Sequence, residues 1–156
     1  MYTHKLEINK RISLEINRMR RTKQKENPLL RQLFWECTLR CNLNCRHCGS
    51  DCHASPESKD MDLSDFLKIL ENIAPHVKPK NTLVITTGGE PLFRPDIVEC
   101  GRAISQKGFL WGMVTNGMLL GKEKLNELLS AGLRTIAISL DGFEEEHNWM
   151  RGNPKS

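Results

Sequence analysis

Residues 4–26 carry the first regular pattern of apolar and polar positions, one that predicts an amphipathic helix. The side chains on its apolar face are Ile8, Ile12, Ile16 and Met19. Most of the other residues are basic or polar, and we expect Asn27 to end the helix because the residue before a proline avoids helical backbone. We expect the apolar face to pack on the domain that follows. Contact with RNA, a membrane surface or an acidic partner is the alternative.

From residue 31 onward the pattern alternates between short apolar runs and amphipathic segments. The runs predict strands at 32–36, 82–86, 109–114 and 134–140. The amphipathic segments predict helices at 62–74, 95–106, 122–131 and 143–150. Short strands rich in Val, Ile, Leu and Trp are typical of buried parallel strands. Four strand–helix units, the last of them incomplete, therefore predict an α/β fold, either a doubly wound sheet or a barrel.

The residues best suited to chemistry follow the carboxyl ends of these strands. A cysteine cluster follows the first strand, and the sequence Gly-Gly-Glu-Pro at 88–91 follows the second. Thr-Asn-Gly at 115–117 follows the third strand, and Asp-Gly at 141–142 follows the fourth. In barrels and open α/β sheets this edge holds the active site. We therefore expect the four loops to converge on one site.

Six cysteines are present, and five of them lie between Cys37 and Cys52. Clustered cysteines in a reducing compartment indicate metal or redox chemistry rather than disulfides. Cys41, Cys45 and Cys48 form a C-x3-C-x2-C pattern, which can hold an iron–sulfur cluster and leave one iron without a protein ligand. A zinc site is the alternative, with further ligands drawn from Cys37, Cys52, His47 or His53. Zinc sites usually combine two separated ligand pairs, so the spacing favours iron–sulfur.

Composition narrows the class of protein. The chain has 156 residues, of which 38% are hydrophobic and 27% charged, as expected of one soluble domain. It has no apolar run long enough for a membrane span and no secretory signal near its start, so we expect a cytoplasmic protein. The net charge of +4 resides in residues 1–31, while the rest of the chain is slightly acidic. The basic charge therefore says little about the core, and we expect neither nucleic acid nor a membrane as a partner of the chain.

The order of these motifs resembles that of the radical S-adenosylmethionine (SAM) superfamily. The resemblance extends from about residue 34 to residue 151 and rests on C-x3-C-x2-C after the first strand and Gly-Gly-Glu-Pro after the second. The segment 139–152 is similar to the subgroup with SPASM C-terminal domains, which includes peptide maturases and anaerobic sulfatase-maturating enzymes. The resemblance implies a partial (β/α) barrel of radical SAM type, with four of about six βα units, preceded by an N-terminal helix. It implies a helical domain at 1–30 and an incomplete core at 31–156, with the C-terminal strands and any SPASM domain absent.

The resemblance also implies a function. Members of the family bind a 4Fe-4S cluster and SAM, and they cleave SAM reductively to a 5′-deoxyadenosyl radical that abstracts hydrogen from a substrate. We expect a peptide or protein substrate and an external one-electron reductant such as flavodoxin or ferredoxin. Because part of the barrel is absent, we expect this chain to bind a cluster but to turn over slowly or not at all. The alternatives are a zinc-stabilised module that binds nucleic acid or protein, and a truncated scaffold without catalysis.

The residue roles that the resemblance implies fall into two groups. The expected cluster ligands are Cys41, Cys45 and Cys48. The expected SAM contacts are His47, Gly88, Gly89, Glu90, Asn116, Ser139, Asp141 and Arg151. The two glycines allow backbone to approach the ligand, and Glu90 either attracts a cation or braces the loop. Ser139, which we place in the fourth strand, is expected to contact the ribose or carboxylate of SAM, and Arg151 to pair with the carboxylate.

Several of these residues also have ordinary structural explanations. His47 is expected against the adenine of SAM; the alternative is an exposed loop histidine or a zinc ligand. Asn116 and Asp141 belong to the expected rim, although as single residues they are typical turn formers. The remaining cysteines, Cys37, Cys52 and Cys100, are not assigned as ligands, and we expect Cys37 to be buried in or beside the first strand.

Overall fold

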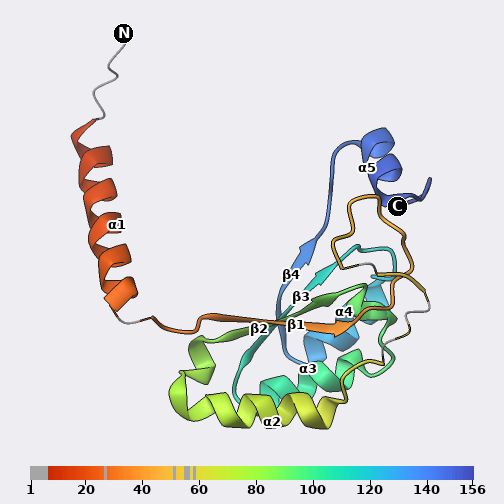
Figure 1. Cartoon of the computed structure of the whole chain (residues 1–156), viewed down its shortest axis with the longest axis horizontal. Coiled ribbons are helices and arrows are strands. Elements are labelled where there is room, and N and C mark those ends of the chain that lie inside the picture. Colours follow the sequence, from red (N-terminus) through yellow and green to blue (C-terminus); the bar gives the residue numbers. More distant parts are fainter. Residues whose placement is uncertain (1–6, 27, 51, 55–56, 58) are drawn as a thin grey trace. The chain divides into compact units, whose positions relative to one another are not determined.

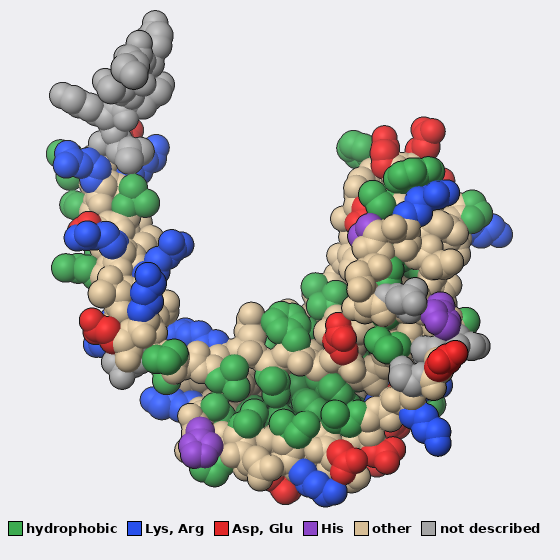
Figure 2. Space-filling view, in the orientation of Figure 1, with side chains coloured by type: hydrophobic (Ala, Val, Ile, Leu, Met, Phe, Trp, Pro, Cys, Tyr) green, Lys and Arg blue, Asp and Glu red, His purple; other side chains and the backbone are tan. Residues whose placement is uncertain are grey.

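The computed structural model describes residues 7–26, 28–50, 52–54, 57 and 59–156, and the chain divides into two units, Met1–Leu30 and Arg31–Ser156. In the first unit, helix α1 spans Ile8–Glu26, and all of its residues are exposed. Lys and Arg side chains are distributed along this helix (Figure 2), as the sequence predicted. The expected packing of its apolar face stays a prediction, and its expected end at Asn27 lies outside the described residues.

The second unit contains a parallel sheet whose strand order, β1-β2-β3-β4, follows the chain. The strands are β1 Gln32–Thr38, β2 Leu83–Gly88, β3 Leu110–Thr115 and β4 Leu133–Ile138. The helices are α2 Leu63–Ile73, α3 Ile97–Gln106, α4 Lys122–Ser130 and α5 Glu144–Arg151. Short 3₁₀ turns lie at Ala74–His76, Pro79–Asn81 and Pro91–Phe93. Each strand and helix that the sequence predicted in this unit is present, with small differences at its ends.

Helices α2, α3 and α4 all cover one face of the sheet (Figure 1). In a doubly wound sheet the strand order reverses part-way and helices cover both faces. In the wall of a barrel the strands follow one another in chain order and helices cover only the outer face. Of the two folds that the strand–helix pattern allowed, the structure therefore has the barrel type. Within the described residues, no helix is both long enough and apolar enough to cross a membrane.

The core fills the layer between the sheet and these helices, and Figure 2 shows apolar side chains gathered over α2 and the neighbouring part of the sheet. Trp35 of β1 stacks on Phe66 of α2, with ring centroids 3.8 Å apart and planes 6° from parallel. Trp111 of β3 is fully buried against Gly101 of α3, where a Cβ would lie 2.0 Å from the indole ring. Aromatic contacts of this closeness fix the helices on the sheet and so fix the strand ends that carry the site.

A buried arginine that the sequence analysis missed holds the ends of two segments together. Arg94 is 4% exposed, and its Nη1 donates to the carbonyl oxygens of Cys37 and Met61 at 2.6 and 2.9 Å. Its guanidinium also binds both carboxylate oxygens of Asp96 and lies 5.0 Å from the ring centre of Trp35. Partial burial acts to raise the pKa of Asp96, but the hydrogen bonds and charge of Arg94 outweigh it and hold that pKa below its usual value. Arg94 thus secures the end of β1, where the loop that carries Cys41, Cys45 and Cys48 (the cysteine loop) begins.

Candidate functional site

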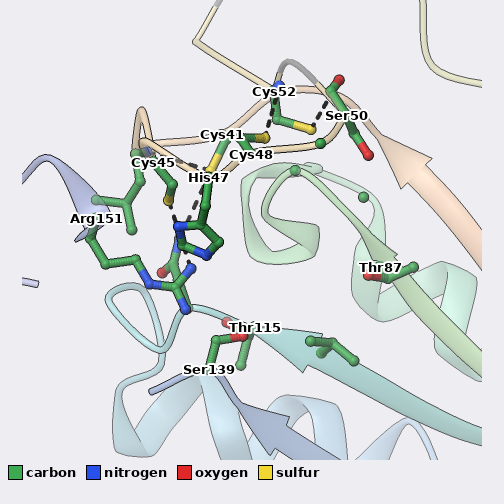
Figure 3. A pocket seen from close by; sticks show the side chains of 16 residues that line it. Cys41, Cys45, His47, Cys48, Ser50, Cys52, Thr87, Thr115, Ser139 and Arg151 are labelled. Carbon is green, nitrogen blue, oxygen red and sulfur yellow. Dashed lines mark hydrogen bonds between the residues drawn. The ribbon is translucent and has the colours of Figure 1, made fainter. Parts of the chain in front are cut away.

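A cavity of about 240 Å³ lies at the carboxyl ends of the strands, and its lining comes from all four strand-end loops (Figure 3). Nine of the eleven residues expected at the site line it: Cys41, Cys45, His47, Cys48, Gly88, Gly89, Asn116, Ser139 and Arg151. The other two, Glu90 and Asp141, contact lining residues from outside the cavity wall. The convergence that the sequence predicted therefore exists in the fold. Thr115 of the Thr-Asn-Gly sequence also lines this cavity, as does Thr87, which the sequence had not singled out.

The three expected ligand cysteines lie on one loop after β1. Cys41 is buried, Cys45 is half-buried and Cys48 is exposed. Backbone N–H groups donate to two of the sulfurs, from Leu43 to Cys41 Sγ at 3.4 Å and from Cys52 to Cys48 Sγ at 3.3 Å. Burial raises the pKa of the Cys41 thiol. A bound metal ion deprotonates a thiol that coordinates it.

The remaining cysteines separate into two environments. Cys37 and Cys100 are fully buried in the apolar core, where burial raises the pKa of each thiol to about 12. Cys52 instead lines the cavity, and its thiol donates to the carbonyl oxygen of Ser50 at 3.7 Å. Burial, followed by the proximity of Cys48, raises the pKa of Cys52 to about 12. That Cys52 is not a cluster ligand stays a prediction.

The two glycines after β2 allow a close approach between two loops of the chain itself. A Cβ on Gly88, which has a φ of +114°, would lie 2.3 Å from the carbonyl oxygen of Thr38. A Cβ on Gly89 would lie 2.3 Å from the carbonyl oxygen of Arg40. Backbone N–H groups use this closeness, since Gly89 donates to Thr38 at 2.7 Å and Glu90 to Arg40 at 2.9 Å. The glycines therefore join the β2 loop to the cysteine loop and also line the cavity.

Glu90 is a fully buried brace, the second of the two roles that the sequence allowed. Its Oε1 accepts from Leu92 N at 3.0 Å and from Thr115 Oγ1 at 2.7 Å. Its Oε2 accepts from Asn116 N at 2.7 Å. The carboxylate thus ties the loop after β2 to the loop after β3.

Asn116 and Ser139 complete the rim on the side of β3 and β4. The Nδ2 of Asn116 donates to Asn42 Oδ1 at 2.8 Å, which connects the β3 loop to the cysteine loop. Ser139 was expected within the fourth strand but lies one residue beyond Ile138, the last residue of β4. Its backbone N–H still donates to Thr115 O at 3.0 Å, so the ladder with β3 continues to the cavity edge.

Asp141 gathers three basic side chains beside the cavity. Its Oδ2 lies 2.7 Å from Arg151 Nε, an ion pair whose angle falls outside hydrogen-bond geometry, and 3.6 Å from His147 Nδ1. Its Oδ1 lies 3.7 Å from Nε2 of His47. Asp141 is therefore the counter-charge of Arg151, and its backbone N–H donates to Nδ1 of His147 at 3.2 Å.

Helix α5 is fastened to the cysteine loop by contacts that the sequence pattern did not reveal. Arg46 donates from its backbone N to Met150 O at 2.9 Å and from Nε to Trp149 O at 3.0 Å. Its guanidinium also lies 4.7 Å from the ring centre of Trp149. Gly152 ends the helix in the left-handed region, and a Cβ there would lie 2.7 Å from Asn44 O. A glycine that follows an amphipathic segment signals the end of a helix, but it does not reveal the close approach of Gly152 to Asn44.

Comparison with known proteins places this arrangement in a family. Residues 35–156 match the family model described as the radical SAM superfamily, which is more than half of the chain. The chain belongs to the radical SAM superfamily. Members of this superfamily use a 4Fe-4S cluster and SAM, which are the cofactors that the sequence predicted.

Curated relatives within the superfamily are enzymes. The AdoMet-dependent heme synthase of Methanosarcina barkeri is 35% identical over 125 residues, which cover 80% of this chain and 35% of that protein. The PqqA peptide cyclase of Bradyrhizobium diazoefficiens is 34% identical over 110 residues, 70% of this chain and 28% of that protein. The chain thus spans about a third of the length of the curated relatives that it matches.

A solved structure confirms the fold class. SuiB of Streptococcus suis, solved with SAM bound, superimposes with a TM-score of 0.63 at 18% identity. The match covers 97% of this chain and 36% of SuiB. At this identity the likeness establishes the radical SAM fold alone.

The residues present at the site fit a 4Fe-4S cluster. The thiols of Cys41, Cys45 and Cys48 line one cavity, as ligands spread over a four-iron body require. Backbone N–H groups donate to the sulfurs of Cys41 and Cys48. Such hydrogen bonds are typical of iron–sulfur sites, where they tune the reduction potential of the cluster.

Proposed function

We propose that this chain holds the cluster and SAM site of a radical SAM enzyme. The observation that carries the proposal is the cavity, where the thiols of Cys41, Cys45 and Cys48 face groups from the other three strand ends. When bound, the cluster supplies the electron that cleaves SAM, and the released radical abstracts hydrogen from a substrate. Cys41, Cys45 and Cys48 would hold the cluster and leave one iron open for SAM.

The other lining residues would hold SAM. Arg151 offers guanidinium N–H groups to the SAM carboxylate, and Ser139, which lies below the cysteine loop in Figure 3, offers a hydroxyl. Gly88 and Gly89 present backbone without side chains, and half-exposed His47 provides a ring for the adenine. Glu90 and Asp141 would act indirectly, by holding Asn116 and Arg151 respectively.

For the substrate we propose a peptide or protein. The PqqA peptide cyclase relative and the SPASM-like segment at 139–152 support this class. A tetrapyrrole is the second candidate, because heme synthases from several organisms are 33–35% identical to this chain. An external one-electron carrier such as flavodoxin or ferredoxin, in the cytoplasm, would supply the electron.

Anaerobic reconstitution with iron and sulfide tests the cluster site. We expect a brown protein with about four irons per chain. Replacing Cys41, Cys45 or Cys48 with Ala should abolish iron retention, because each provides one of three ligands. Cys52→Ala is the matched control, since it removes a thiol from the same cavity and should retain the iron. Stoichiometric zinc without iron uptake would refute the proposal, and iron loss in the control would refute the ligand assignment.

Turnover is tested separately from cluster binding. The cluster-loaded chain is supplied with dithionite and SAM, and 5′-deoxyadenosine is measured by chromatography. Formation of 5′-deoxyadenosine would support catalysis, and its increase on adding a peptide or a tetrapyrrole would identify the substrate class. A soluble, cluster-loaded chain that binds SAM but forms no product would favour the scaffold alternative.

A further inference from the structure

Each of the three cavity cysteines that form C-x3-C-x2-C receives a hydrogen bond at its sulfur. Backbone N–H groups donate to Cys41 and Cys48, from residues two and four positions further along the same loop. Cys45 receives a different kind of donor, since Nη1 of Arg151 lies 3.7 Å from its sulfur. Figure 3 shows Arg151 beside Cys45, with its guanidinium near the sulfur. This donor carries a full positive charge and comes from 106 positions away in the sequence.

The guanidinium of Arg151 is held in place from several directions. Arg151 is 9% exposed, and its Nε lies 2.7 Å from the Asp141 carboxylate. Helix α5, which carries it, is fastened to the cysteine loop through Arg46 and Trp149. Fixing a long side chain costs conformational entropy, and folding has already met that cost for Arg151 because packing and the Asp141 carboxylate hold it. The contact with Cys45 is therefore built into the fold.

We propose that Arg151 is a positioning residue that raises the reduction potential of the cluster through its charged N–H···S contact with Cys45. The inference rests on the proposed function, because it presupposes a cluster on these thiolates. Reduction adds one negative charge to the cluster, and a cationic donor at a ligand sulfur stabilises the reduced form more than the oxidised form. Asp141 fixes the direction of the guanidinium, which also faces the cavity. One side chain thus links the cluster to the space where a SAM carboxylate would bind.

The test is an anaerobic redox titration of the reconstituted chain, followed by the electron paramagnetic resonance signal of the reduced cluster. In Arg151→Gln we expect the ratio of reduced to oxidised cluster at a fixed poise to fall about tenfold, because a charge-assisted bond is lost. Arg151→Lys keeps the charge without the planar fork and should show a smaller fall. Arg40→Gln is the matched control, because Arg40 precedes Cys41 and its guanidinium binds Asp60 rather than a sulfur. We expect the control to stay within about twofold of the wild type.

The outcomes separate this inference from the proposed function. An unchanged potential in Arg151→Gln with normal iron content would overturn the inference and leave the cluster site standing. An equal shift of the potential in Arg40→Gln would also overturn the inference, because the shift would then come from removing any nearby positive charge and not from the contact between Arg151 and Cys45. If neither Arg151 variant retains iron while the wild type does, Arg151 is needed for assembly and the tuning role fails. A wild-type chain that binds no cluster would overturn the proposed function first, and this inference with it.

Discussion

Glu90→Gln is the most informative single substitution, because the Glu90 side chain accepts three hydrogen bonds while fully buried. An amide of the same shape keeps one acceptor oxygen and turns the other into an NH₂ donor. If the oxygen stays near Leu92 and Thr115, the new NH₂ faces the backbone N–H of Asn116. If the amide flips, two donors lose their acceptor. Either orientation leaves at least one buried donor unsatisfied.

The expected loss of unfolding free energy is about 2–4 kcal/mol, from the orphaned donor together with the loss of charge-assisted bonds. Urea unfolding of the apo chain under reducing conditions, followed by circular dichroism, measures it directly. The matched control is Glu99→Gln, which makes the same chemical change at an exposed position of α3 and should cost less than about 1 kcal/mol. We also expect weaker iron retention in Glu90→Gln than in the control, since Glu90 holds Asn116, whose side chain connects the β3 loop to the cysteine loop. Equal stability of the two variants would show that Glu90 is not the brace described here.

Two further predictions concern the same framework. Gly89→Ala should destabilise the chain by about 2 kcal/mol or more and reduce iron loading, because its Cβ would overlap Arg40 O at 2.3 Å. Gly49→Ala, where nothing lies within 4 Å of the added Cβ, should behave like the wild type in the same urea and iron assays, and equal behaviour of the two variants would contradict the close approach. Arg94 lowers the pKa of Asp96 in the folded protein. The ionised Asp96 therefore stabilises the fold at pH values above 3.8, its ordinary pKa, and this stabilisation is lost as the pH falls through the pKa of the folded state. Between neutral pH and a pH of about 3, the unfolding free energy of Asp96→Asn should therefore fall less than that of the wild type. The difference should be modest because the Asp96 side chain is 37% exposed. Identical dependence of the unfolding free energy on pH in the two proteins would refute this prediction.

The order of elements and the location of the site were predictable from local patterns. Apolar runs and amphipathic segments located the strands and helices, because period and length differ between the two. The motifs followed strand ends, and parallel strands bring those ends to one edge whatever the details of packing. The cysteine spacing and the Gly-Gly-Glu-Pro sequence then predicted the family and its cofactors, and the match to the superfamily over residues 35–156 confirmed both.

The roles of individual residues were less predictable, since they depend on which loops touch. Gly88 and Gly89 were expected to admit a ligand, yet their lack of side chains also admits the backbone of Thr38 and Arg40. Glu90 was open to two roles until its three donors, two of them more than twenty positions away, identified it as a brace. Arg94 was missed because its partners on β1 and before α2 are distant in sequence.

What the sequence determined by itself is the set of chemical groups and the edge of the sheet where they meet, because both follow from local propensity and strand polarity. The tertiary structure decided how those groups are held and paired. Arg151 illustrates the difference, since its type suited a carboxylate partner, but its contacts with Asp141 and Cys45 exist only because α5 packs on the cysteine loop. Contacts across 106 positions depend on the folded backbone, and no local pattern of the sequence encodes them.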